Sequence, residues 1–282
     1  MPKVQVTNQR GLVQSAGEGF QADSGLTVHH ENSKAGGSGP SALVVGKGNT
    51  RAAANPFAES STQLWPFGTM LHYGDRVFRY AGIGGVAVTA GKTLQASAAV
   101  ANHRDVAVQA AAAAAATAVS VTLGATAATE DQYAEGYLHI NDVAGQGQLL
   151  RIKSHPAIGS AAAGIITLYD PIVTALTTSS KADLIACGFN DLVVAPAAET
   201  GPVVGVTAMD MTEDYFGWVQ VAGPCSVLTV GTIVLGEHAV RSGGTDGGVA
   251  PATNDLLENL GSVMVVNDTA DNSVIWLKLG SS

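Results

Sequence analysis

The stretch at residues 73–93, "YGDRVFRYAGIGGVAVTAGKT", decides between two kinds of protein. Gly82, Gly84 and Ala87 match the dinucleotide-binding pattern G-x-G-x-x-A, and Asp105 follows about 20 residues later, where that pattern places an acidic residue. In such a site the glycine turn opens a helix, whose N-terminal amides hold the pyrophosphate. Here the next residues alternate, are rich in β-branched side chains and end in Ala-Gly-Lys, which is typical of a strand and a hairpin turn. We therefore predict a strand, a turn and a second strand, and no cofactor.

The other chemical signatures searched for in the sequence do not form complete patterns. A phosphate-binding loop that ends at Thr93 needs glycine where Val86 stands, and Gly85 comes one residue too early. His29 and His30 are adjacent, so on a strand they point to opposite faces, and we expect the other histidines to lie on the surface or in satisfied cores. The candidate carboxylates all lie at expected strand ends or turns, where such side chains commonly cap the chain: Asp75, Asp105, Asp142, Asp170, Asp210, Glu213 and Asp214. We therefore predict no catalytic residue and no metal ligand.

Composition indicates a globular β protein with an unusual surface. Of the 282 residues, 46% are apolar but only 13% are charged, which is about half the usual share, so assembly with other subunits is one way to cover the surface. The net charge is −9 and the 14 Lys and Arg residues are scattered, which disfavours a nucleic-acid partner. The N-terminus "MPKVQVTNQRG" has no apolar signal region, and no run reaches the roughly 18 apolar residues of a membrane helix. We expect synthesis in a cytoplasm and no membrane partner.

The chain divides into three parts by sequence pattern. Residues 1–62 are rich in turn residues and predict an extended N-terminal arm with one or two short strands. Residues 63–196 alternate in short segments, which predicts a central β domain. Pro196 and Pro202 flank a polar kink that is typical of a linker, and residues 197–282 return to the β pattern. The fold class predicted is mainly β: short antiparallel strands in two barrel-like or sandwich-like domains.

Several segments carry specific expectations. We predict strands at 86–88, 218–221, 227–230 and 233–235, and the clearest strand at 274–279, where Ile275 and Leu277 face one side and Trp276 the other. Residues 106–123 predict a strand with a short helical or extended alanine segment. The best helix is "ATNDLLENLGS", with Thr253 or Asn254 as cap and Gly261 as end. Cys187 and Cys225 are far apart, so they form either a disulfide or, more commonly, two buried thiols.

The C-terminal third resembles a known group of proteins. Residues 214–279 carry Gly236, the pair Gly243-Gly244, "GSV" at 261–263 and the final hydrophobic strand, in the order found in the small β domain of tailed-bacteriophage virion structural proteins, especially capsid decoration (cement) proteins. The central "WPFGTMLHYGDRVFRYAGIGG" is also similar to virion structural proteins. The chain is larger than a minimal cement protein.

This resemblance implies a non-enzymatic protein of the virion. It implies a homotrimer that binds the major capsid protein on the outer capsid surface and stabilises the shell, with arms that reach neighbouring subunits. A tail or head fibre, or a receptor-binding protein, shares the β-rich trimer and is the alternative, although no repeat or heptad is present. A polysaccharide hydrolase on a β scaffold is a third class, and a major capsid subunit is disfavoured because no long helical segment is present.

Four aromatic residues are the candidates for interfaces, because aromatic side chains concentrate there. They are Trp65, Phe67, Trp218 and Trp276. The alternative for each is an anchor in a small core.

Overall fold

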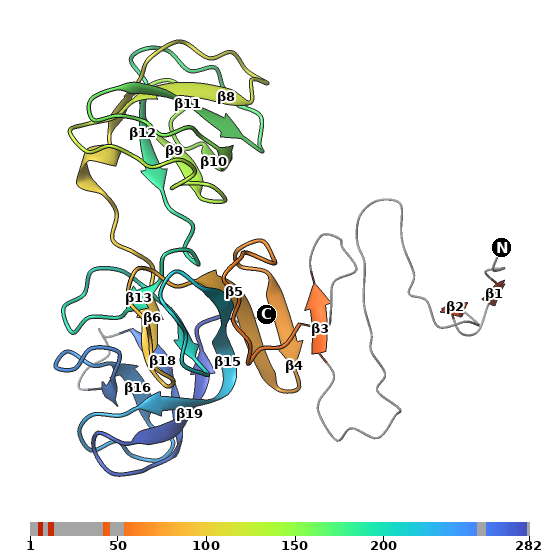
Figure 1. Ribbon diagram of the computed structural model, residues 1–282, viewed down its shortest axis with the longest axis vertical. Coiled ribbons are helices and arrows are strands. Elements are labelled where there is room, and N and C mark those ends of the chain that lie inside the picture. The colour runs from red at the N-terminus through yellow and green to blue at the C-terminus, as the bar shows by residue number, and fades with distance from the viewer. Residues whose placement is uncertain (1–4, 8–10, 14–41, 46–53, 253–257, 281–282) are drawn as a thin grey trace.

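The protein consists almost entirely of β-strands arranged as two units (Figure 1). The computed structural model describes residues 5–7, 11–13, 42–45, 54–252 and 258–280. Within them, the 3-10 helix η1 (Ala101–His103) is the one helical element, so the mainly β fold class is confirmed. A closed barrel stands at one end of the molecule, and a large curled sheet forms the other (Figure 1).

The barrel is built from six antiparallel strands in the order β10-β11-β8-β7-β12-β9. They are β7 (Val106–Val108), β8 (Ala118–Thr122), β9 (Tyr137–Asp142), β10 (Leu149–Ser154), β11 (Ala163–Leu168) and β12 (Lys181–Ile185). Alternation decides which side chains point inward: on β9, Leu138 and Ile140 are fully buried, whereas Tyr137 and His139 face outward. The barrel interior is thus filled by aliphatic side chains, as the scarcity of aromatics predicts.

The larger sheet has eleven strands, and its main path is β13-β6-β14-β15-β19-β18-β16-β17. A side branch, β3-β4-β5, joins it at β15. The strands are β3 (Ala42–Val45), β4 (Met70–Tyr73), β5 (Arg76–Gly82), β6 (Thr93–Gln95), β13 (Val193–Val194), β14 (Val203–Thr207), β15 (Phe216–Leu228), β16 (His238–Arg241), β17 (Val249–Pro251), β18 (Asn259–Val265) and β19 (Asn272–Lys278). Separately, β1 (Gln5–Thr7) pairs with β2 (Gly11–Val13).

The sheet curls back on itself. The amide of Thr93, at the start of β6, donates to the carbonyl of Gly247 at 3.0 Å, and the amide of Gly247 donates to Ala195 at 2.7 Å. These bonds bring the segment before β17, at one end of the strand order, against β6 and β13 at its other end. The curl encloses an aliphatic core that includes Val227, Leu260 and Ile275, all fully buried.

The barrel is an insertion between two neighbouring strands of the sheet. β6 precedes it, β13 follows it, and Val193 and Val194 pair with Gln95 and Leu94. The chain therefore leaves and re-enters the sheet at adjacent points. The structure does not divide at residues 196/197 as expected. The strands β4, β5 and β6 precede this point but lie in the same sheet as the strands that follow it. Most of the expected arm at 1–62 lies outside the described residues, but β3 pairs with β4.

Strand β15 changes its partner halfway along its thirteen residues. Its first half pairs with β5, and from Ala222 onward it pairs with β19. Gly223 lies at the change with φ +86°, and a Cβ there would come within 2.2 Å of the carbonyl oxygen of Asp75, so only glycine fits. The two strands expected at 218–221 and 227–230 are therefore one continuous strand up to Leu228, because the glycine bends the strand without ending it.

Other expectations for individual segments have mixed outcomes. The final strand is confirmed, with Ile275 and Leu277 buried and Trp276 exposed. The strand at 86–88 is reduced to a single bridge from Val88 to Met211, and the segment 233–235 is a turn beside β18. The helix expected to end at Gly261 is wrong for Asn259, Leu260 and Gly261, which lie in β18, because pairing with β19 outweighs local helix preference. Residues 253–257 lie outside the described residues.

The alanine segment contains no helix. Residues 110–116 connect β7 to β8, and Ala112 forms a bridge with Leu176. Ala115 adopts φ +68°, which no right-handed helix accommodates. The helical alternative is therefore wrong, since an isolated alanine helix below roughly 12 residues is marginal. Of the extended alternative only the bridge at Ala112 occurs, because the amide of Ala116 closes a turn on Ala113.

The pairing of β18 with β19 leads to a test at Gly261. A Cβ at this position would lie 2.1 Å from the carbonyl oxygen of Trp276, which is backbone and cannot move aside. We expect Gly261→Ala to lower the free energy of unfolding by at least about 2 kcal/mol, measured by urea denaturation. The matched control is Gly243→Ala, since that Cβ meets nothing within 4 Å; its effect should stay within about 0.5 kcal/mol. Equal effects of the two variants would contradict the close approach of the strands.

Candidate functional site: the cleft at the joint

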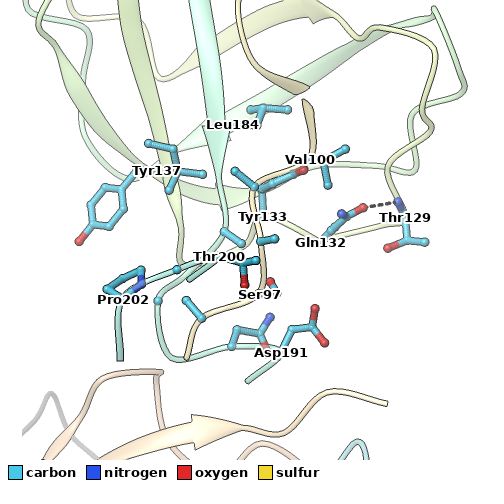
Figure 2. A pocket seen from close by; sticks show the side chains of 18 of the residues that line it. Ser97, Val100, Thr129, Gln132, Tyr133, Tyr137, Leu184, Asp191, Thr200 and Pro202 are labelled. Carbon is cyan, nitrogen blue, oxygen red and sulfur yellow. Dashed lines mark hydrogen bonds between the residues drawn. The ribbon is translucent and has the colours of Figure 1, made fainter. Parts of the chain in front are cut away.

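A cleft of about 900 Å³ lies where the barrel meets the sheet (Figure 2). Its walls come from both connecting segments, residues 96–100 and 186–191, from the barrel turn that contains Thr129, Gln132 and Tyr133, and from residues 200–202 of the sheet unit. Most lining side chains are small or apolar. The cleft thus lies at the joint between the two units.

The glycines of the opening stretch hold the returning connection in place. The amide of Gly82 donates to Phe189 and the amide of Leu192 donates back to Gly82, both at 2.9 Å; the amide of Gly84 donates to Leu192 at 2.9 Å. A Cβ at Gly84 would lie 2.6 Å from Oδ1 of Asp191. The glycines thus permit close approach of a neighbouring segment. The strand β5 and the turn after it are present as predicted, whereas the second strand expected at 86–88 is a single bridge and β6 begins only at Thr93.

Glu135 fastens the barrel to the sheet unit. Its Oε2 accepts the backbone amide of Phe67 at 2.7 Å, and its Oε1 accepts Nε2 of Gln63 at 3.0 Å. Arg151 lies 3.7 Å from the same carboxylate on the barrel side. Glu135 itself has φ +60°, which aims its side chain out of a tight turn. This carboxylate therefore forms the polar clamp between the two units.

Tyr133 and two histidines form a buried hydrogen-bonded chain behind the cleft. His103 and His155 have exposed fractions of 0% and 3%. His103 Nε2 donates to the Thr126 carbonyl at 2.9 Å, so its Nδ1 accepts the hydroxyl of Tyr133. Burial raises the pKa of Tyr133 to about 12, because the phenolate would lose its hydration. Both histidines are satisfied core residues, one of the two alternatives that the sequence left open.

The chemistry of the cleft is that of a hydrogen-bond acceptor surface. Asp191 and Asp214 are exposed and come from separate segments, whereas no Lys, Arg or His lies among the lining residues. Asn190 and Gln132 add amide groups, with Gln132 Oε1 accepting the amide of Thr129 at 3.1 Å (Figure 2). Such a lining repels anions and favours neutral or cationic polar groups.

The carboxylates singled out from the sequence serve mainly to hold turns. Asp142 accepts the amide of Val143, Asp170 that of Arg151, and Asp210 that of Ala90, each at 2.8 Å. Asp105 lies outside the cleft, in a polar group on the barrel with His139, Asn141 and Asp183: its amide donates to Asp183 at 2.8 Å, and Asp183 meets His139 at 3.0 Å. The turn-capping expectation is confirmed for Asp142, whereas Asp170 and Asp210 accept amides from segments distant in sequence, in β10 and at Ala90.

The four aromatic interface candidates do not gather at one place. Trp218 is buried and its ring centroid lies 6.4 Å from that of half-buried Trp65, while Phe67 stacks on Phe216 at 6.0 Å. Trp65 and Trp218 line a smaller apolar hollow of about 300 Å³. Trp276 is 41% exposed on β19. Trp218 thus has the core role left open as the alternative.

Several residues of the joint carry no recognisable signal in the sequence. Glu135, Asn190 and Asp191 belong to no recognisable motif, and the partners of Glu135 lie 68 and 72 residues away along the chain. The histidines His103 and His155 were visible only as isolated residues. Only the density of glycine at 82–85 marked a place where backbones approach closely.

Cys187 and Cys225 are both free and buried, one beside the returning connection and the other on β15. Burial raises the pKa of both thiols, that of Cys225 to about 12. Of the two alternatives, the structure therefore has two buried thiols.

Comparison of the chain with protein-family models, with curated proteins and with solved structures found no match. Among the residues described, no group of three or more His, Cys, Asp or Glu side chains is placed to hold a metal ion. No helix in the described part of the chain is long and apolar enough to cross a membrane.

The raised pKa values predict a loss of stability in alkali. The unfolded chain ionises Tyr133 near its ordinary pKa of 10.0 and Cys225 near 9.0, whereas the folded protein holds both protons up to about pH 12. Deprotonation therefore stabilises the unfolded state as the pH rises from about 9 to about 12. The protein has its full free energy of unfolding only below about pH 9. In a Cys225→Ala background, Tyr133→Phe should flatten the alkaline decline of the barrel's melting temperature.

The same variant has a second effect at neutral pH. Tyr133→Phe removes the hydroxyl whose hydrogen bond His103 Nδ1 accepts. It should therefore lower the free energy of unfolding at neutral pH by about 1 kcal/mol, measured by urea unfolding. An alkaline decline as steep in Tyr133→Phe as in its parent would contradict the assignment to this phenol.

Proposed function

We propose that the chain is a non-enzymatic structural protein of a tailed-phage virion, a capsid decoration protein that binds the outer capsid surface and stabilises the shell. The observation that carries this proposal is an apolar outer face on strands β18 and β19. The resemblance of residues 214–279 to decoration proteins supplies the class, the homotrimer and the major capsid protein as partner.

The outer face of β18 and β19 carries exposed apolar side chains beside the polar Ser262 and Lys278. Trp276 lies opposite Ser262, and Val274 opposite Val265. Met264, Val265, Val266 and Trp276 are all exposed at 40% or more. The turn before β16 lies beside them, since the amide of Gly236 donates to Val263 at 2.9 Å, and it presents Leu235 with an exposed fraction of 63%. We call this set of residues the β18–β19 face.

The inner side of the same strands is apolar as well. Ile275 and Leu277 are fully buried in the core of the sheet. An antiparallel strand with one face in water normally alternates apolar and polar residues, whereas a strand covered on both faces is apolar throughout. Residues 263–266 and 274–277 follow the second pattern. This supports the proposal that another protein surface covers the β18–β19 face in the assembled particle.

The N-terminal strand β3 is consistent with an arm that reaches other subunits. It adds to the edge of β4 through four residue pairs. Strand addition at a sheet edge is a general mode of attachment, because main-chain hydrogen bonds supply the contact without a shaped pocket. In the proposed particle the same kind of contact joins the arm to neighbouring subunits.

Immunogold labelling of virions with an antibody against this chain tests the location. Label spread over the head supports decoration, whereas label confined to the tail or to one vertex favours a fibre or receptor-binding protein. Absence of label from every particle would overturn the virion assignment. A glycan-degradation screen with turnover that Asp105→Ala abolishes would contradict the non-enzymatic part.

The contact surface has its own test in binding to empty expanded capsids. We expect Trp276→Ser to weaken binding at least about 30-fold, since a central Trp contributes about 2 kcal/mol or more to an interface. Ile165→Ser is the matched control, because Ile165 is an exposed aliphatic residue on the barrel; it should change the affinity less than about twofold. An unchanged affinity for Trp276→Ser would place the contact elsewhere.

A receptor-binding role is the second candidate, and the far end of the barrel favours it. β9 runs from Tyr137 at the cleft to Asp142, so the loop 143–148 lies at the opposite end. Gln148 joins this loop to residues 173–174: its Oε1 accepts the amides of Val173 and Thr174, and its Nε2 donates to Gly145 and Thr174. Val173, 77% exposed, is thereby held firmly at a tip. If purified protein blocks phage adsorption and Val173→Ser does not, this role is supported.

A further inference from the structure

We infer that His155 is an acid-sensitive release for the joint between the barrel and the sheet. The inference concerns the barrel and its clamp and does not depend on the proposed virion role. It rests on three observations: the hydrogen bonds of the His155 ring, its burial, and the short turn that connects it to Glu135.

The two ring nitrogens of His155 face groups of opposite character. Nδ1 lies 2.8 Å from the carbonyl oxygen of Pro156, which only accepts, so Nδ1 carries a proton. Nε2 accepts the backbone amide of Tyr133 at 3.0 Å. A backbone amide only donates and cannot rotate its hydrogen away. The site therefore fits the neutral imidazole and has no acceptor for a proton on Nε2.

Protonation removes the bond to Tyr133 and adds a buried charge. A hydrogen on Nε2 would point directly at the hydrogen of the Tyr133 amide. With 3% of the residue exposed, water cannot replace the lost partner without an opening of the turn. His103 differs in this respect, because its partner is the hydroxyl of Tyr133, which can turn and accept. His155 is thus the more sensitive of the two.

The titratable groups around the His155 ring do not offer an alternative partner for Nε2. Asp131, which is exposed, uses Oδ1 to accept the backbone amide of His155 at 2.8 Å. Tyr133 packs its ring 5.8 Å from the imidazole, and its hydroxyl is bonded to His103. The carboxylate of Asp131 attracts a charged imidazole through space, but its bond is to the main chain.

The turn that His155 holds is the turn that carries the clamp. The amide of Ala134 donates to Asp131 at 2.9 Å and that of Gly136 to Tyr133 at 3.0 Å, so residues 131–136 form one compact unit. Tyr133 is its buried anchor, and Glu135, two residues on, reaches out to Phe67 and Gln63 of the sheet unit. Release of the Tyr133 amide loosens this unit and frees the Glu135 carboxylate from Phe67.

Hydrogen exchange of two amides in the full chain measures separately the loss of the His155 hydrogen bond and the loss of the Glu135 clamp. The Tyr133 amide reports the bond to His155, and the Phe67 amide reports the clamp. After correction for the intrinsic exchange rate, both should lose at least about tenfold in protection between about pH 7.5 and about pH 5, a range that reaches below the pH at which an exposed histidine gains its proton. The loss should follow the titration of the His155 ring observed by NMR in the same samples.

The matched variant is His155→Gln, whose amide can donate to Pro156 and accept from Tyr133 without titrating. Its two amides should stay protected within about twofold over the same range. His139→Gln is the control for loss of a histidine as such, because His139 lies half-buried on the outer face of the barrel, and it should behave as the parent does.

Three results would overturn the inference. The first is equal loss of protection at Phe67 in the parent and in His155→Gln, which would assign the release to another group such as Glu135 itself. The second is titration of His155 with both amides still protected. The third is protection of both amides and an unprotonated His155 down to about pH 5. If His155→Gln does not fold, the NMR titration and exchange of the parent still decide the second and third results.

Discussion

The large sheet depends on the point where β15 changes its partner, and the side chain of Gln220 stabilises that point by hydrogen bonds. At this residue β15 exchanges its partner β5 for β19, and the pairing register slips between Gln220 and Ala222. Gln220 is fully buried there, and the carbonyls of Ala222 and Pro224 lie within reach of its side chain. Gln220 Nε2 donates to Ala222 and Pro224 at 3.0 and 2.8 Å, while Arg76 donates to its Oε1 through both Nε and a terminal nitrogen. Because buried polar groups are costly when unpaired, this network allows one strand to serve two partners.

The same constraint explains how the barrel is attached. β15 fixes β5 and β14, and these in turn fix the ends of β6 and β13. The insertion therefore starts and ends on adjacent strands of a rigid edge, and the returning segment follows the glycines at 82 and 84. Beyond these two connections, the carboxylate of Glu135 adds hydrogen bonds from the barrel to Gln63 and Phe67 of the sheet unit. A joint held by few polar bonds is also the part of the molecule most open to control by protonation.

Sequence pattern predicted the local β structure well and the assembly of the strands poorly. Alternation at 274–279 identifies both faces of β19, because inward and outward side chains differ in hydrophobicity there. No local pattern identifies β15 as one strand, since Gly223 and Pro224 are breakers whose effect is cancelled only by partners at Asp75 and Trp276. The candidate site was the least predictable part of the structure. Glu135 contacts Phe67 across 68 residues of sequence, and a lone glutamate in a turn belongs to no motif.

The distribution of apolar surface separates the roles of the two units. The sheet unit exposes Met264, Val265, Val266 and Trp276 around β18 and β19, beside the polar side chains of Ser262 and Lys278. The barrel keeps its aliphatic core inside and exposes apolar side chains of its own, among them Ile165 on β11 and Val143 and Val173 at its far end. A unit with a broad apolar face suits a permanent contact, whereas a compact barrel on a polar joint suits a part that faces solvent. In the proposed virion role, the β18–β19 face favours attachment through the sheet, with the barrel directed away from the capsid.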